Sequence, residues 1–304
     1  MAVFSFFMTR IQANLLLLLA SIIWGSTFVV QQVATGGLGA IMFTSSRFFL
    51  GGLVIFPIAF VQFKRKQRTD RKITQGEWAG MVFTGLALFT AAVLQQVGIF
   101  FTTIANAGFL TALYVPLVPV LAFLVLKTSI HWSVWPASIG CLVGTYIMSG
   151  AQELHLSVGD IWVISSAFFW ATHVLLVGRM ATKTQAPLVV AFVQFMTVAI
   201  AGLIVGVIVE KPVLADFSEA IFGIFYAGVL SVGAGFTLQV IAQRYSPSSD
   251  AAIILSGETV FAALAGFLFL GEKLSTAQLS GAALILAGIL MVQLLPLYTS
   301  KKDN

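Results

Sequence analysis

Residues 248–291 read SSDAAIILSGETVFAALAGFLFLGEKLSTAQLSGAALILAGILM. This stretch predicts two membrane helices joined by a turn at Gly271-Glu272-Lys273, because each apolar run has about 20 residues, the length that crosses a bilayer core. Glu258 lies about ten residues inside the first run, so its carboxyl is roughly 15 Å deep. An ionisable group at that depth is costly and typical of a transport or relay site. The alternative is a neutral or hydrogen-bonded carboxyl that only holds helices together.

The composition places the chain among integral membrane proteins. Hydrophobic residues make up 59% of the 304 positions and charged residues only 9%, against about 25% charged residues in soluble domains. The net charge of +5 does not indicate nucleic-acid binding, since the basic residues gather at membrane borders. The single cysteine, Cys141, excludes an internal disulfide and lies in an apolar run, where packing is its expected role.

Apolar windows of about 20 residues predict ten membrane helices, and the loops between them are too short for a soluble domain. The predicted spans are 13–33, 40–62, 77–97, 103–126, 132–150, 158–178, 187–209, 218–240, 248–270 and 275–296. Several begin with a capping box, in which side chains bind the first free backbone amides. These boxes are Thr74 to Glu77, Ser157 to Asp160, and Ser275 to Gln278. The first span is longer than a secretory signal core, so we expect an uncleaved helix.

The distribution of lysine and arginine predicts the orientation. With the N-terminus in the cytoplasm, thirteen of the sixteen basic residues lie on the inner side, Lys211 and Lys273 lie on the outer side, and Arg47 lies within a span. Lysine and arginine are retained on the cytoplasmic side of membranes. We therefore expect a multi-pass protein of the cell inner membrane with both termini cytoplasmic.

The two halves of the sequence resemble each other. A shift of 144 residues places Gln95 on Gln239, and a shift of 146 places Trp24 on Trp170. Each half has five predicted spans, an odd number, so the second half must enter the membrane from the opposite side. We therefore expect an all-α membrane protein of ten transmembrane helices in two inverted five-helix repeats, whose substrate site lies near the midplane. The expected domains are 13–150, 157–296 and a cytoplasmic tail, 297–304.

The repeat indicates where the site lies. Trp24 and Trp170 are about eleven and twelve residues into their spans, near the bilayer centre, whereas most membrane tryptophans lie at the interfaces. Tyr114 is the repeat partner of Glu258, and His173 follows Trp170 by one turn. We predict that these five side chains line a substrate site. The alternative is an aromatic core around one structural hydrogen bond from Tyr114 to Glu258.

Three further polar residues are candidates for gating or ion pairing. Arg47 lies roughly 10 Å from the outer side, where it either snorkels or reaches the buried carboxyl. Gln95 and Gln239 fall near opposite ends of their helices and are expected at the two mouths of a path. Pro116 and Pro119 interrupt the fourth span and permit a kink there. The sequence has no metal-ligand cluster, nucleophile elbow or phosphate loop, so we expect no cofactor and no enzyme.

From about Asn14 to Val292 the sequence resembles the EamA family of the drug/metabolite transporter superfamily. The stretches that carry the resemblance are SGETVFAALAGFLFLGEKLSTAQLSGAALILAGIL, its degenerate copy NAGFLTALYVPLVPVLAFLVLK, the early ASIIWGSTFV and SSRFFLGGLVI, and GDIWVISSAFFWATHVLLVGR. The resemblance implies a ten-helix inner-membrane carrier whose spans 1, 3, 4, 6, 8 and 9 surround a cavity. It also implies motif roles for Glu258, Glu272 and Arg47. In the first half, Lys127-Thr128 replaces the Gly271-Glu272 pair.

We therefore expect a secondary-active carrier that exports amino acids or related small metabolites by alternating access. An intramembrane enzyme or sensor using the same cavity, and a carrier for organic cations or drugs, are the alternatives. Energy must come from an ion gradient or the substrate's own gradient, because the sequence has no ATP-binding loop. The expected partners are a small-molecule substrate, the lipid bilayer and protons as a candidate coupling ion, with a monomeric protein and no nucleic acid.

Overall fold

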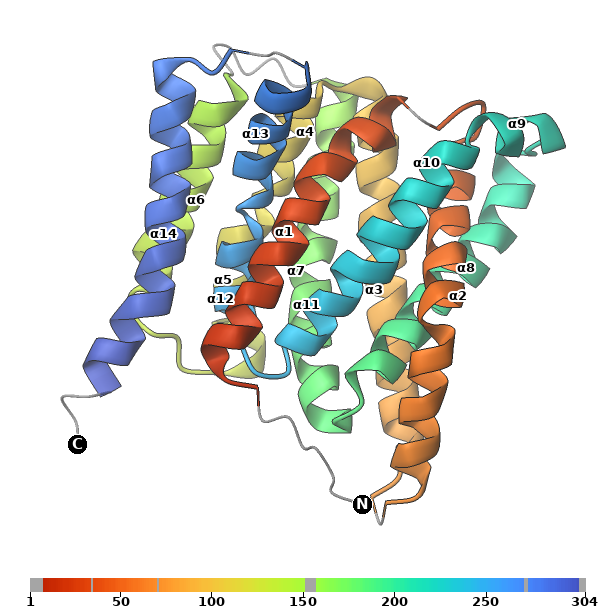
Figure 1. Ribbon diagram of the computed structural model, residues 1–304, viewed down its shortest axis with the longest axis horizontal. Helices are drawn as coiled ribbons and strands as arrows, with labels where there is room; N and C mark the ends of the chain where they lie inside the picture. Colours follow the sequence, from red (N-terminus) through yellow and green to blue (C-terminus); the bar gives the residue numbers. More distant parts are fainter. Residues whose placement is uncertain (1–7, 34, 70, 151–156, 271–272, 301–304) are drawn as a thin grey trace.

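The computed structural model describes residues 8–33, 35–69, 71–150, 157–270 and 273–300, and within them every regular element is a helix. The helices stand side by side in one bundle (Figure 1). The elements of the first half are α1 (Arg10–Val33), α2 (Ala40–Gln67), α3 (Gln75–Phe101), α4 (Ile104–Thr111), α5 (Tyr114–Leu126) and α6 (Val134–Ser149). Those of the second half are α7 (Val158–Thr184), α8 (Pro187–Val209), α9 (Leu214–Glu219), α10 (Ile221–Tyr226), the π-helix η1 (Ala227–Phe236), α11 (Thr237–Ala242), α12 (Ser248–Leu255), α13 (Glu258–Leu270) and α14 (Thr276–Ser300).

The expected all-α membrane fold is confirmed. Among the described residues, eight segments are long and apolar enough to cross a membrane. The 24-residue α1 and the shorter apolar α6 run alongside them (Figure 1). The crossing of the membrane by all ten predicted segments therefore stays a prediction. Helix α14 continues to Ser300, and the expected domain division into 13–150, 157–296 and a tail at 297–304 stays a prediction.

The capping boxes form where the sequence predicts them. The Thr74 hydroxyl accepts from the Glu77 amide at 3.3 Å, and the Glu77 carboxylate accepts from the Thr74 amide at 2.9 Å. These bonds satisfy backbone donors that have no partner inside the helix and so fix its first residue. The same reciprocal pair forms between Ser157 and Asp160, and between Ser275 and Gln278.

Two predicted spans are broken near their middle. The fourth span divides into α4 and α5 at Ala112-Leu113, and the ninth divides into α12 and α13 at Ser256-Gly257. The two breaks are 144 positions apart, the offset of the sequence repeat. In the first half Pro116 explains the break, because proline has no amide hydrogen for the carbonyl four residues earlier. Discontinuous membrane helices of this kind supply free backbone groups at transporter sites.

Helices α6 and α14 have corresponding places in the two halves and pack closely against each other. A Cβ on Gly144 would lie 2.6 Å from the Gly281 carbonyl oxygen, and a Cβ on Gly281 would lie 2.6 Å from that of Gly144. The Cys141 sulfur lies 3.8 Å from the carbonyl oxygen of Ile285, a residue exactly one repeat later. Glycine is required at this contact because any side chain would separate the two backbones.

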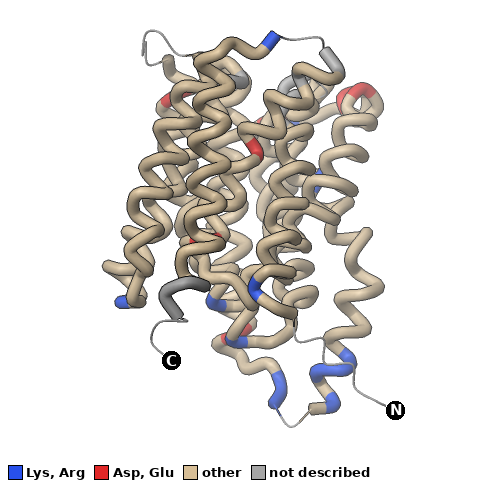
Figure 2. Tube along the Cα trace, turned by 60° about the vertical axis from the view of Figure 1, so that its left-hand side comes forward, with Lys and Arg blue, Asp and Glu red and all other residues tan. Residues whose placement is uncertain are grey.

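The two ends of the bundle differ in charge. Both termini lie at one end, and most lysine and arginine residues gather there (Figure 2). This arrangement agrees with the basic-residue count, and the cellular side of that end stays a prediction.

Candidate functional site

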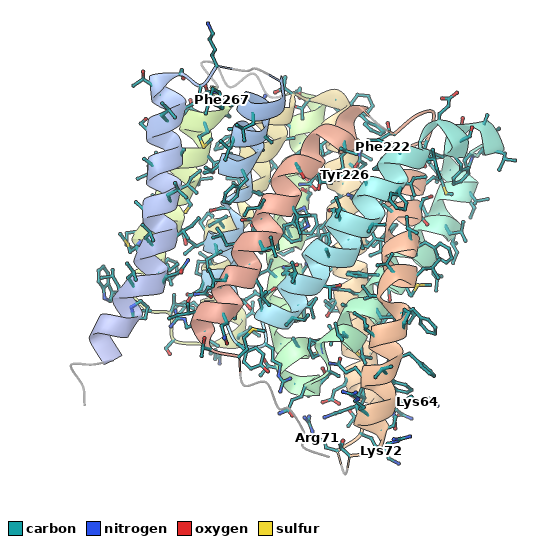
Figure 3. The ribbon with its side chains drawn as sticks, viewed as in Figure 1. Lys64, Arg71, Lys72, Phe222, Tyr226 and Phe267 are labelled. Atoms are coloured by element: carbon teal, nitrogen blue, oxygen red, sulfur yellow. The ribbon has the colours of Figure 1, made fainter. Side chains whose placement is uncertain are left out.

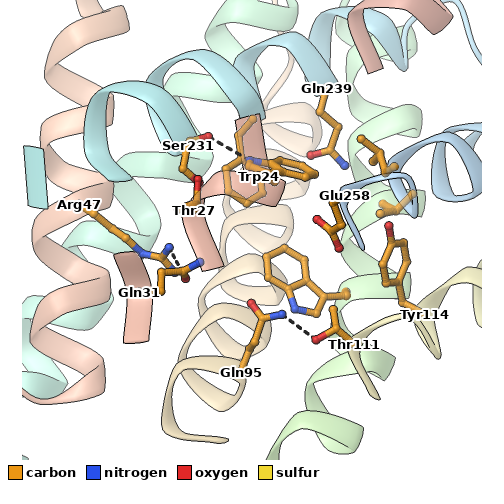
Figure 4. Close-up of a pocket in the computed structure, with 14 residues that line it drawn as sticks. Trp24, Thr27, Gln31, Arg47, Gln95, Thr111, Tyr114, Ser231, Gln239 and Glu258 are labelled. Atoms are coloured by element: carbon orange, nitrogen blue, oxygen red, sulfur yellow. Dashed lines mark hydrogen bonds between the residues drawn. The ribbon is translucent and has the colours of Figure 1, made fainter. Parts of the chain in front are cut away.

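A cavity lies inside the bundle, between the two broken helices (Figure 4). Seven of the eight candidate side chains line it, and His173 is the exception. The complete lining is Trp24, Thr27, Gln31, Arg47, Gln95, Thr111, Tyr114, Trp170, Val174, Ser231, Phe236, Gln239, Leu255 and Glu258. The structure thus brings the predicted residues together, and their role in binding substrate stays a prediction.

The helix breaks place the two central side chains. Tyr114 is the first residue of α5 and Glu258 the first residue of α13, so each follows its break directly. The Tyr114 hydroxyl donates to the carbonyl oxygen of Ala252 at 3.4 Å, and the predicted alternative of a bond to Glu258 does not form. Within the described part of the chain, the Glu258 carboxyl makes no hydrogen bond and no ion pair. A partly buried carboxyl without a protein partner is available to a ligand or a proton.

Aromatic rings surround this carboxyl. The Trp24 ring centroid lies 4.6 Å from that of Phe236. The Trp170 ring stacks on Phe236, with centroids 5.9 Å apart and 13° between the planes. The Trp170 indole nitrogen is buried and has no partner among the described residues. Phe236 could not be predicted from the sequence. The chain has 27 phenylalanines, and the repeat pairs this one with Ala92, which is not aromatic.

The π-helix η1 positions Trp24. The Trp24 indole nitrogen donates to the Ser231 carbonyl oxygen at 3.2 Å. A Cβ on Gly235 would lie 2.5 Å from that nitrogen, so glycine is needed for the indole to approach. π-Helical turns are often found at functional sites, and this one was not predicted. The signal available in the sequence was the spacing of Gly228, Gly233 and Gly235.

Arg47 corrects an expectation. It neither snorkels nor reaches Glu258: its side chain is buried, and its Nη1 donates to Gln31 Oε1 at 2.6 Å. The guanidinium carbon lies 5.8 Å from the Phe43 ring centroid and 5.4 Å from that of Phe48. Figure 4 shows Arg47 and Glu258 at opposite sides of the cavity. The cavity therefore has a cationic side and a carboxyl side.

The two glutamines differ in their bonding. Gln95 Nε2 donates to the Thr111 hydroxyl at 2.8 Å, whereas Gln239 Oε1 is buried without a partner among the described residues. Both line the cavity itself, and their predicted location at two mouths of a path stays a prediction.

His173 lies behind the cavity wall. Its Nε2 is 2.9 Å from Gln194 Oε1, and its ring packs 5.9 Å from Trp170 and 6.2 Å from Phe236. It therefore supports two lining rings and does not contact the cavity. Glu272, the second motif glutamate, lies outside the described residues. The described residues hold no group of three or more His, Cys, Asp or Glu side chains that suits a metal.

The cavity is narrow, with about 50 Å³ of free volume. A single water needs at least roughly 10–15 Å³ of such volume, so a few waters fit and a metabolite does not without movement of the lining helices. Two of the lining residues carry buried polar atoms without a partner in the described part of the chain, Trp170 Nε1 and Gln239 Oε1.

Comparisons with known proteins agree with one another. The model of the EamA-like transporter family matches the chain twice, over residues 11–150 and 157–294. An uncharacterized transporter of Archaeoglobus fulgidus is 30% identical over 292 residues, which cover 94% of this chain and 87% of that protein. The uncharacterized transporter YwfM of Bacillus subtilis is 25% identical, with 93% of this chain and 94% of that protein covered. A solved crystal structure shares the fold at 20% identity, with a TM-score of 0.75, 94% of this chain and 98% of that chain covered.

Proposed function

The chain belongs to the EamA-like transporter family, and from this premise we propose that it exports amino acids or related small metabolites by alternating access of its two repeats. The family and the relatives make it a membrane transporter. The observation that carries the finer proposal is Glu258, an unpartnered carboxyl beside a helix break, with aromatic rings around it. A carboxyl attracts an amino group, and aromatic faces attract cations and apolar groups.

Contacts between helices of different repeats close the bundle at the end that holds the termini. Arg10 at the start of α1 forms an ion pair with Asp250 in α12, and it also donates to the Val292 carbonyl oxygen at 3.3 Å. One turn further into α1, Asn14 accepts from the Ser246 hydroxyl at 2.8 Å. These bonds must break for the cavity to open at this end, which supports a gate there in an alternating-access cycle.

The site also suits a second class of substrate, organic cations or drugs. The same carboxyl with Trp24, Trp170 and Tyr114 around it resembles the aromatic cages that bind ammonium groups. Amino acids remain the first choice, because the buried guanidinium of Arg47 across the cavity offers donors to a carboxylate.

Counterflow in proteoliposomes tests the proposal. Purified protein is loaded with each member of a panel of amino acids and organic cations, and uptake of the labelled solute is followed. We expect Trp170→Ala to lower counterflow by tenfold or more while the protein stays monodisperse. Trp162→Ala is the matched control, because this tryptophan lies on the exposed face of the same helix. Absence of counterflow for every solute in folded wild-type protein, or equal effects of the two variants, contradicts the proposal.

A further inference from the structure

The hairpin between α2 and α3 carries a dense positive charge. Six of the nine residues from 64 to 72 are lysine or arginine, and the hairpin forms one tip of the bundle, where Figure 3 labels Lys64, Arg71 and Lys72. Arg71 is occupied: it binds Glu77 Oε1 at 2.8 Å and the Lys183 carbonyl oxygen at 2.7 Å. Lys64 and Lys72 are exposed and form no ion pair with a described residue.

An apolar groove opens on the outside of the helix bundle, next to this tip. Phe56, Phe60 and Phe63 of α2, Trp78 of α3, and Phe192 of α8 form most of its wall, and its volume is about 190 Å³. Phe56 and Phe60 are 46% and 45% exposed, so the groove faces the membrane. The rings pack in pairs, with centroids 5.5 Å apart for Phe56 and Phe192, and 6.0 Å apart for Phe63 and Trp78.

The groove and the basic tip adjoin each other. Phe63 is followed at once by Lys64, whose ammonium lies 5.2 Å from the Phe60 ring centroid. Lys72 lies in the loop before α3, six residues ahead of Trp78. A molecule seated on the rings therefore ends beside exposed ammonium groups that have no anionic partner in the described part of the chain.

We propose that this groove and the basic tip bind one anionic phospholipid, with an acyl chain against the rings and the headgroup between Lys64 and Lys72. The membrane supplies the acyl chain, and the charge of the tip selects the headgroup. Clusters of four to eight basic residues next to a membrane helix attract anionic lipids with about 1 kcal/mol for each residue. Lysine stems also cover apolar surface while the ammonium group reaches the headgroup.

A second groove supplies the contrast. It lies between α3, α5 and α7, is larger at about 410 Å³, and is lined by Phe83, Leu121 and Phe168 among others. Its α5 wall ends at Leu126, and one basic residue, Lys127, follows. If apolar surface alone selected lipid, this groove would be the stronger site; the charge argument predicts the reverse.

Native mass spectrometry of the detergent-purified full chain tests the site, with phosphatidylglycerol and phosphatidylcholine as probes. We expect one phosphatidylglycerol to bind more tightly than phosphatidylcholine. The double variant Lys64→Gln/Lys72→Gln should weaken phosphatidylglycerol binding by roughly 25-fold, from about 1 kcal/mol for each lysine, and leave phosphatidylcholine binding unchanged. Phe60→Leu/Trp78→Leu should weaken the binding of both lipids.

The matched control is Lys127→Gln/Lys273→Gln, which removes the same charge elsewhere and should leave binding of both lipids unchanged. An equal loss of phosphatidylglycerol binding in this control would show diffuse attraction and overturn the site. Equal affinity of the wild-type protein for the two lipids, or an affinity for phosphatidylglycerol that does not fall with added salt, would overturn it as well. Both wild-type measurements are independent of whether any variant folds.

Discussion

Helix α3 and its repeat partner, the segment α10–η1–α11, have the same place in the two halves and different backbones. The first is a regular α-helix of 27 residues, whereas the second contains a ten-residue π-helix. Their repeat-related glutamines differ as well: Gln95 is hydrogen-bonded, and Gln239 has an unpartnered oxygen. At the helix breaks the first half offers Tyr114 and the second Glu258. The repeats therefore share a scaffold, and the second half carries the irregular backbone and the ionisable group.

This comparison assumes that the two repeats have inverted topology. A test of topology therefore has the largest expected effect, since each reporter lies on one side of the membrane or the other. Reporter fusions after Asn304 and in the loop at Thr69 should both report cytoplasm, because the basic residues gather at that end. A fusion at Lys211, beyond the opposite end of α8, should report the outer side. A periplasmic signal from either of the first two fusions would remove the inverted repeat.

Substitution of Glu258, the carboxyl residue at the second half's helix break, should have the next largest effect. If Glu258 carries a coupled proton, Glu258→Gln should abolish accumulation driven by a pH gradient and preserve exchange at equilibrium. Tyr114→Phe, the control at the repeat-related position, should retain most accumulation. The measurement is uptake into proteoliposomes with and without an imposed gradient. Undiminished gradient-driven uptake in Glu258→Gln would show that another group carries the proton.

Repeat-related positions in the two helices allow a reciprocal test of the π-helix. Gly235→Ala should destabilise the protein by about 1–3 kcal/mol, since the new methyl group overlaps the Trp24 indole. Position 91, its partner in α3, is already alanine, and Ala91→Gly should cost about 1–2 kcal/mol, through helix propensity and the loss of one buried methyl group. Thermal unfolding measures both changes, and tryptophan fluorescence should shift only in Gly235→Ala. Equal shifts would mean that η1 has no special contact with Trp24.

The smallest effect is expected at the closed end. Asp250→Asn weakens the pair between Asp250, whose side chain is 5% exposed, and Arg10, whose side chain is 33% exposed; because solvent still reaches Arg10, we expect a loss of about 1 kcal/mol. A cysteine at cavity position Val174, in a Cys141→Ala background, should react up to about fivefold faster with a reagent added at the termini end. Asp216→Asn, at the opposite end of the bundle, is the control. A slower reaction in Asp250→Asn would contradict a gate at this pair.

Local patterns in the sequence predicted much of this structure. The capping boxes follow from a few neighbouring residues, whereas α2, α3 and α7 extend four to six residues beyond their predicted ends. The 144-residue offset relates Tyr114 and Glu258, and each of them directly follows a helix break. The resemblance to the EamA family was confirmed by two matches to the family model.

The misses have geometric causes. His173 was expected in the cavity because it lies one turn from Trp170, but three residues rotate a side chain further from the starting face than four do. Val174, four residues on, lines the cavity, and His173 points toward Gln194 instead. Arg47 was expected either to snorkel or to reach Glu258 from its depth in the membrane, and depth gives no information on direction within the bilayer plane. Its partner, Gln31, depends on how α1 and α2 face each other.

The close glycine contact between α6 and α14 has a mechanical consequence. Neither helix contributes a residue to the cavity among those described, and their backbones are already in contact at Gly144 and Gly281. Because these two backbones already touch, we expect this seam to stay fixed if the cavity helices move during transport. A spectroscopic label on the outer face of α14 would then be a fixed origin from which the movement of every other helix is measured.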